Sequence, residues 1–299
     1  MFTSLARLLS PTLVRSTPPD MLQKRVRLFL GFLFSTPVAL LAYRRRSLSR
    51  SGVGSAIVTG TTIVGMGGWS WGLAIIFFFV SSSFFSHFHA REKAVTAEDK
   101  FSKGSQRDLL QVAANGGVAT ALALGHGLLS EHKLQQALQA GYTGALATAT
   151  ADTWATELGV LSTHPPRLIT TGKHTTPGTS GGITLAGTAS SAAGALALGT
   201  SFWLVQRKRR ETVALPFIAL ISGLLGSLFD SFLGATVQAM YFCPSCQKET
   251  ERRVHNCGSK TQPFRGRPWL NNDVVNFLST LFGAVAALFL HISIQQRHR

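Results

Sequence analysis

The stretch Val213–Met240, VALPFIALISGLLGSLFDSFLGATVQAM, is mostly apolar and holds one ionisable side chain, Asp230. About 20 apolar residues are enough for a helix to cross the hydrocarbon of a bilayer, and this stretch is longer than that. A carboxylate in or beside such a span is costly to bury, and it usually faces a bundle interior or a water-filled cavity. The stretch therefore predicts a membrane helix that contributes to a functional site.

Seven further apolar runs occur along the 299-residue chain. They are Leu28–Tyr43, Val53–Gly67, Trp69–Phe88, Leu109–Leu129, Leu134–Ala151, Ser180–Val205 and Asp273–Ile294. Only 14% of the residues are charged and the mean hydropathy is +0.20, whereas about a quarter of a soluble domain is charged. Several runs are short or contain Gly or Pro, so we predict an all-α, polytopic integral membrane helix bundle with six to eight transmembrane helices.

Three regions are expected. Residues 1–24 form a basic polar N-terminal tail, and residues 25–106 hold the N-terminal transmembrane helices and a polar loop. Residues 107–299 form the core, with a polar Cys/His insert at 241–272. The tail has no acid before Asp20, which fits either an organelle transit peptide or a disordered basic segment. The expected location is the endoplasmic reticulum or an organelle envelope membrane.

The formal net charge is +16, and the basic residues flank the apolar runs. This pattern fits the excess of cations in cytoplasmic loops and their attraction to anionic headgroups. We expect no nucleic-acid partner, because the basic residues do not form one stripe with aromatic side chains. The sequence leaves the oligomeric state open.

Strict alternation of the spans places Arg44–Arg50 and the loop at residues 152–182 on one face, which we expect to be cytoplasmic. Arg207–Arg210 then falls on the opposite face, against the charge rule. Either Ser180–Val205 is re-entrant or the number of spans is wrong by one.

One face of the helix around Asp230 is small and polar. At 100° per residue, an arc of about 120° contains Gly223, Gly226, Ser227, Asp230, Gly234 and Gln238. This face fits a metal or nucleotide site that the glycines allow a ligand to approach. It also fits a helix-packing seam in which Asp230 pairs with a basic residue.

A second acidic motif, ADTWATELG, carries Asp152 and Glu157. The two acids are about 140° apart on an ideal helix, so they converge on one ion only if it lies between their faces or the helix breaks. Magnesium prefers one or two carboxylates together with water and substrate phosphates. We therefore predict Asp152, Glu157 and Asp230 as catalytic acids, with Asp152 and Asp230 as Mg²⁺ ligands. The alternative for Glu157 is an ion pair with Arg167 or Lys173.

The glycine-rich stretch KHTTPGTSGG lies between the two acidic motifs. It is not a Walker motif, because His174 stands where Ser or Thr is required. Its backbone N–H groups and hydroxyls precede an apolar run, as at helix N-termini that bind anions. The residues expected to hold phosphate are Lys173, Thr179, Ser180, Gly181 and Gly182. A helix N-cap after a proline turn is the structural alternative.

Two polar stripes on other predicted helices suggest further contacts. Arg107, Gln111 and Asn115 are spaced four residues apart, and Asn272 and Asn276 share a face with Ser279 and Gly283. We expect Arg107, Asn115 and Asn276 to contribute to phosphate or nucleotide binding, although structural hydrogen bonds explain the stripes equally well.

All three cysteines lie in the polar insert, at Cys243, Cys246 and Cys257, with His255 beside them. Three thiolates and an imidazole form a complete tetrahedral zinc set. A complete set leaves no open position, so a bound Zn²⁺ would be structural. Thiols without metal in a polar loop are the alternative.

These motifs resemble the transmembrane protein 19 family in order and spacing over about residues 107–288. The resemblance rests on NGG at 115–117, DTWA at 152–155, PRLITT at 166–171, PGT at 177–179 with Gly181-Gly182, GS at 226–227, DS at 230–231, LGAT at 233–236, and Asn272 with Val275-Asn276. The family includes plant phytyl-phosphate kinase. Its Asp and Gly motifs are also similar to those of dolichol kinase and phosphatidate cytidylyltransferase, which use CTP.

The resemblance implies a membrane enzyme that transfers a phosphoryl group from a nucleoside triphosphate, CTP or another, to an isoprenoid alkyl monophosphate, with Mg²⁺ as cofactor. Phosphoryl transfer depends mainly on positioning and charge neutralisation, which suits a site without an evident nucleophile. An ion-coupled transporter using the same acids and a non-catalytic membrane protein are the alternatives.

Overall fold

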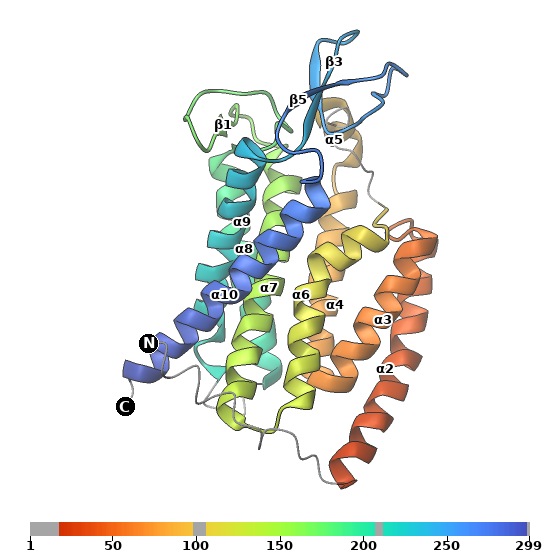
Figure 1. The fold of residues 1–299 in the computed structure, drawn as a ribbon, viewed down its shortest axis with the longest axis vertical. Helices are drawn as coiled ribbons and strands as arrows, with labels where there is room; N and C mark the ends of the chain where they lie inside the picture. The colour runs from red at the N-terminus through yellow and green to blue at the C-terminus, as the bar shows by residue number, and fades with distance from the viewer. Residues whose placement is uncertain (1–17, 98–105, 207–211, 298–299) are drawn as a thin grey trace.

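The computed structural model describes residues 18–97, 106–206 and 212–297, and these residues form a bundle of long helices (Figure 1). Each predicted apolar run corresponds to one long helix. They are α2 (Pro18–Arg44), α3 (Arg50–Gly67), α4 (Trp69–His87), α6 (Leu109–Leu128), α7 (His132–Gly159), α8 (Leu185–Gln206), α9 (Leu215–Thr236) and α10 (Asn272–Arg297). A short helix, α5 (Ala90–Ala97), follows α4. The prediction of an all-α membrane bundle is confirmed.

Five of these helices, α2, α4, α8, α9 and α10, are by themselves long and apolar enough to cross a membrane. Helices α3, α6 and α7 do not meet that standard, and of these α7 lies at the centre, where it packs against α4, α6, α8, α9 and α10. Every residue from Ala140 to Ala151 is buried. A helix enclosed by protein on all sides needs small residues for close packing, not a lipid-facing apolar surface.

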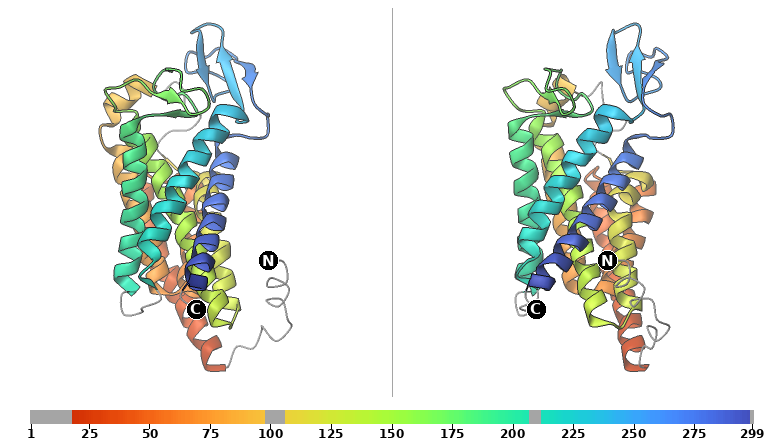
Figure 2. Two further views of the ribbon diagram at one scale, coloured as in Figure 1. Left: turned by 90° about the vertical axis from the view of Figure 1, so that its left-hand side faces the viewer. Right: turned by 60° about the vertical axis from the view of Figure 1, so that its left-hand side comes forward.

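Successive helices alternate in direction, so that one end of the bundle collects most of the polar connections. This polar end carries residues 45–49, 88–97, 160–184 and 237–271. The loop at 160–184 and the insert at 237–271 lie next to each other over it (Figures 1 and 2). Helix α8 is one continuous helix of 22 residues that packs along α7 and α9, which does not fit a re-entrant Ser180–Val205 segment. Arg207–Arg210 and the proposed transit segment in residues 1–17 lie outside the described residues.

Small residues let the core helices approach one another. An added Cβ on Gly226 or Gly283 would strike the Thr148 side chain, and one on Gly144 would strike the backbone of Gly283. The glycine face of α9 therefore serves as a packing seam in its middle turns. Asp230, one turn nearer the polar end, faces a cavity instead.

Short strands in the loops were not expected from the sequence. In the loop after α7, β1 (Arg167–Leu168) pairs antiparallel with β2 (Gly182–Ile183). The Cys/His insert contains β3 (Met240–Cys243), β4 (Lys248–Thr250) and β5 (Gln262–Arg265) as an antiparallel sheet in the order β4-β3-β5. Both sheets sit over the polar end of the bundle (Figure 2).

Candidate functional site

A cavity of about 500 Å³ opens at the polar end, within the size range of ligand pockets. It is lined by side chains from α4, α6, α7, α8, α9 and α10 and by the two polar loops. Ten of the eleven residues predicted from the sequence for the acidic and phosphate sites line it: Arg107, Asn115, Asp152, Glu157, Thr179, Ser180, Gly181, Gly182, Asp230 and Asn276. Lys173 is not among the lining residues.

Asp152 from α7 and Asp230 from α9 contribute the two acids nearest the centre of the bundle. The carboxylates of Asp152 and Asp230 repel each other electrostatically, and Asp230 lies within hydrogen-bonding distance of the Ser279 hydroxyl. Its Oδ2 atom is buried, and no group in the described part of the chain hydrogen-bonds to it. Two carboxylates that repel each other at a cavity are a costly arrangement unless a cation joins them. Asn115 and Asn276 line the same cavity, and carboxylate and amide oxygens are ligands that suit Mg²⁺.

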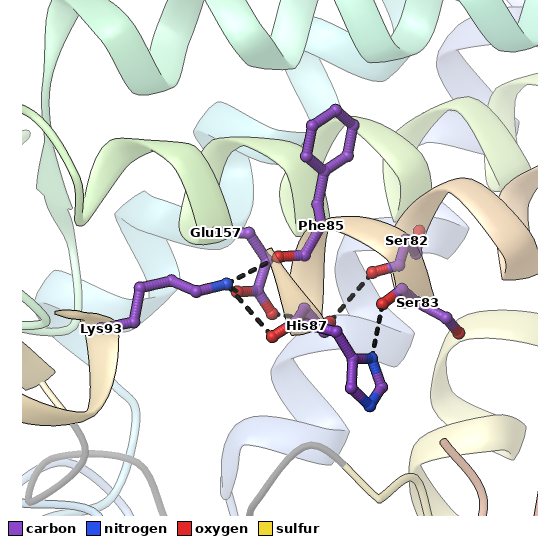
Figure 3. Close-up of polar contacts among 7 residues, drawn as sticks. Ser82, Ser83, Phe85, His87, Lys93 and Glu157 are labelled. Atoms are coloured by element: carbon purple, nitrogen blue, oxygen red, sulfur yellow. Dashed lines mark hydrogen bonds and ion pairs between the residues drawn. The ribbon is translucent and has the colours of Figure 1, made fainter. Parts of the chain in front are cut away.

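Glu157 lines the same cavity, but its two carboxylate oxygens already have partners. Oε1 accepts a hydrogen bond of 2.7 Å from Ser86. Oε2 forms an ion pair of 2.5 Å with Lys93 (Figure 3). Lys93 also donates to the carbonyls of Phe85 and Ser86, at the C-terminal end of α4, where a cation is favourable. Glu157 is thus paired with Lys93, not with Arg167 or Lys173, and it ties α7 to α4 and α5.

Arg107 places a cation on the cavity wall just before α6. Its guanidinium donates to the Ser83 hydroxyl at 3.0 Å and lies over the rings of Phe78 and Phe79 at 5.9 and 5.6 Å. Burial lowers the pKa of Arg107 to about 10, and the charge of Glu157 opposes that shift. The group remains charged at neutral pH and can attract phosphate.

The glycine-rich loop packs closely on the end of α9. Gly178 and Gly181 have φ values of +76° and +83°, a conformation that favours glycine. A Cβ on Gly181 would lie 2.6 Å from the backbone N of Ala235. Ser180 donates to Gln238 at 2.9 Å, which fixes the loop to the chain just beyond α9.

Helix α8 starts beyond the loop, so the expected N-cap is displaced. It begins at Leu185, and Thr184 accepts a hydrogen bond of 2.9 Å from the Gly187 N–H. Thr184, not Ser180, therefore caps this helix. Two loop amides, those of Thr179 and Gly182, donate to carbonyls of the loop itself. The loop is a folded turn over the cavity and not a direct helix N-terminus.

Lys173 lies outside the cavity for a local reason. It follows Gly172, whose φ is +67°, in a turn closed by the Leu168 N–H donating to the Lys173 carbonyl at 2.9 Å. The turn projects from the β1 end, and the Lys173 side chain is exposed. The phosphate role expected for this residue is not supported by its position.

Several cavity residues were missed by the sequence analysis. They include Ser86, Lys93, Ser191 and Glu251. Lys93 lies in a polar connection without hydrophobic periodicity, and Glu251 belongs to the insert, which is distant in sequence from the acidic motifs. No local sequence pattern therefore identified these two residues. Gln111 and Asn272, which belonged to the two polar stripes, do line the cavity.

The four predicted zinc ligands come together in the insert. One ligand atom from each of Cys243, Cys246, His255 and Cys257 lies within 4.8 Å of the others. None of the cysteines forms a disulfide.

Comparisons with known proteins agree with this architecture. The family described as integral membrane protein DUF92 matches residues 33–284. Protein PGR of Arabidopsis thaliana is 33% identical over 274 residues, covering 85% of this chain and 93% of that protein. An uncharacterized membrane protein of Methanocaldococcus jannaschii is 26% identical over 92% of this chain and 99% of its own length. No solved structure matches the chain.

The family match covers most of the bundle and all the helices that contribute acids to the cavity. The resemblance to the transmembrane protein 19 family is confirmed, and the chain belongs to the DUF92 family of integral membrane proteins.

Proposed function

We propose that the protein is a Mg²⁺-dependent membrane phosphotransferase that moves a phosphoryl group from a nucleoside triphosphate to an isoprenoid alkyl monophosphate. The observation that carries this proposal is that Asp152 and Asp230 line one cavity, with Oδ2 of Asp230 buried and without a hydrogen-bond partner among the described residues. A cationic side chain, Arg107, and a glycine-rich loop share their cavity. Carboxylates for a metal and donors for phosphate are what phosphoryl transfer requires.

Three groups of cavity residues would have distinct roles in the reaction. Asp152 and Asp230 would hold Mg²⁺, which neutralises charge on the transferred phosphate. Arg107 and the backbone of the Gly178–Gly182 turn would orient the phosphates. Glu157, already paired with Lys93, would hold α4 and α5 in place beside the site.

The depth of the site favours an enzyme over an ion-coupled transporter. Asp152 lies seven residues before the end of α7, and Asp230 lies six residues before the end of α9. At a rise of about 1.5 Å per residue, both acids are only about 10 Å from the polar end. Transporter sites usually lie near the bilayer midplane, whereas a lipid phosphate and a soluble nucleotide meet at the interface.

A second, apolar groove of about 550 Å³ offers a place for the isoprenoid tail. Its walls are Leu73, Ile76, Phe77, Val80, Ser81, Phe84, Phe85 and Trp154. The segment of α4 from Leu73 to Phe85 spans about 18 Å at 1.5 Å per residue. Phe85 adjoins Ser86 of the polar cavity, and Trp154 lies two residues from Asp152. A tail in this groove would place its phosphate at the acids.

The test uses purified protein in lipid nanodiscs with Mg²⁺, one of CTP, ATP, UTP or GTP, and a panel of isoprenoid monophosphates. Mass spectrometry should detect the alkyl diphosphate with wild-type protein and not with Asp230→Asn. Absence of diphosphate with every nucleotide, together with ion uptake into liposomes without nucleotide, would establish the transporter instead.

A further inference from the structure

We propose that the Cys/His insert binds one structural Zn²⁺ through Cys243, Cys246, His255 and Cys257, and that this metal holds the glycine-rich loop over the cavity. The inference goes beyond the proposed reaction, and its test requires no phosphotransferase activity.

The positions of the ligand atoms match a tetrahedral site. With zinc–sulfur bonds of about 2.3 Å, two thiolates on one ion lie about 3.8 Å apart. The Cys243 and Cys257 sulfurs are 3.7 Å apart, and Nδ1 of His255 is 3.3 Å from the Cys257 sulfur. A disulfide needs sulfurs about 2.05 Å apart, so this spacing fits a shared metal and not a bond between the cysteines.

The insert needs a stabilising metal because it has only a small hydrophobic core of its own. Its three strands have only three or four residues each. The side chains of Phe264 and Trp269 are exposed, and the buried positions include two of the four ligands, Cys243 and His255. Small units without a sufficient apolar core commonly depend on a structural metal or on disulfides.

The insert is fastened directly to the loop. Arg265 on β5 donates to the Gly234 carbonyl at 2.6 Å and to the Ser180 carbonyl at 3.3 Å, while its Nε pairs with Glu249 on β4. Gln238 accepts from Ser180 and donates to Glu251 at 2.8 Å.

Strand β3, which ends at Cys243, pairs with both β4 and β5. A metal at Cys243 therefore fixes the two strands that position Arg265 and its partner Glu249. Loss of the metal should release Arg265 and, with it, the Ser180 backbone.

The first measurement is the metal content of the purified full-length protein. Elemental analysis should give one zinc per chain, and X-ray absorption should give three sulfur ligands and one nitrogen. Cys243→Ser and Cys246→Ser should lower the zinc content to near zero. The matched control is Ser245→Ala, which lies between two ligands but is not one, and it should keep the full zinc content. Folded wild-type protein without zinc, or with another metal, would overturn the assignment.

The second measurement is hydrogen–deuterium exchange in the peptide covering residues 176–184. Exchange should rise in Cys243→Ser and in wild-type protein stripped by a chelator. Arg265→Ala should keep its zinc yet show the same rise, because it breaks the connection and not the metal site. Unchanged exchange after zinc removal would refute the role of the metal in holding the loop.

Discussion

Replacing Gly181 by alanine tests whether the glycine-rich loop must lie directly against α9. The φ of Gly181 is +83°, and an added Cβ would lie 2.6 Å from the backbone N of Ala235. The left-handed conformation costs a non-glycine residue about 1–2 kcal/mol. Forcing a methyl group into packed structure adds about 1–3 kcal/mol. The added Cβ would also lie 2.5 Å from Cβ of Ala235, whereas carbon atoms pack about 3.5–4.0 Å apart, so relief requires the loop to move by about 1 Å.

Gly172→Ala is the matched control. Its φ is +67°, and nothing lies within 4 Å of an added Cβ. It should lose only the conformational part, about 1–2 kcal/mol. Both variants gain equally from the stiffer unfolded chain, so that effect cancels in the comparison.

Thermal unfolding in detergent and kcat/KM for diphosphate formation would be measured for both variants. Gly181→Ala should be less stable than Gly172→Ala by about 1–3 kcal/mol. Its kcat/KM should fall about 100-fold, because a displacement of about 1 Å is enough to disrupt a catalytic geometry. Equal stability and equal activity in the two variants would refute the close approach of loop and helix as a requirement.

Three further predictions concern the acids, the exposed lysine and the helix seam. Asp152→Asn and Asp230→Asn should each lower kcat at least about 100-fold, because each removes a metal ligand. Neither should lower the melting temperature, because each also removes a costly buried charge. Normal turnover in either variant would contradict the Mg²⁺ assignment. Lys173→Ala should leave kcat/KM within about twofold, as expected for an exposed residue outside the cavity, and a tenfold loss would return it to the phosphate site. Gly283→Ala should destabilise the protein by about 1–3 kcal/mol in a melting experiment, because its Cβ would strike α7. Gly54→Ala, in open space on α3, should stabilise it by about 0.5–1 kcal/mol. Similar melting temperatures of the two variants would contradict the packing seam.

The apolar runs in the sequence predicted every long helix, but they did not predict where each helix begins and ends. Helix α2 starts at Pro18, ten residues before the run at Leu28, because a helix can extend beyond the hydrocarbon with charged turns such as Lys24 and Arg25. Helix α8 starts at Leu185 and not Ser180, because the residues before it fold into a turn and a short strand. These boundaries depend on hydrogen bonds and tertiary contacts, which apolar periodicity does not encode.

Part of the cavity could be predicted because burying a charge is costly. Asp152 and Asp230 stood out as acids within apolar sequence, and the structure places both on one cavity. The partner of Glu157 could not be predicted, since Lys93 lies 64 residues away in the chain, in a short polar helix without a distinctive pattern. Lys173 looked suitable from its neighbours in sequence, but the turn at Gly172 carries it away from the cavity.

The burial of α7 has a consequence for the biosynthesis of this protein. The translocon admits helices largely according to their own affinity for lipid, and α7 lacks the apolar surface to meet that requirement unaided. Three of the helices that enclose it, α8, α9 and α10, are synthesised later. A nascent chain that ends before α8 should therefore fail to keep α7 stably across the bilayer, and membrane integration of the centre of this protein should be completed only after synthesis has passed α10.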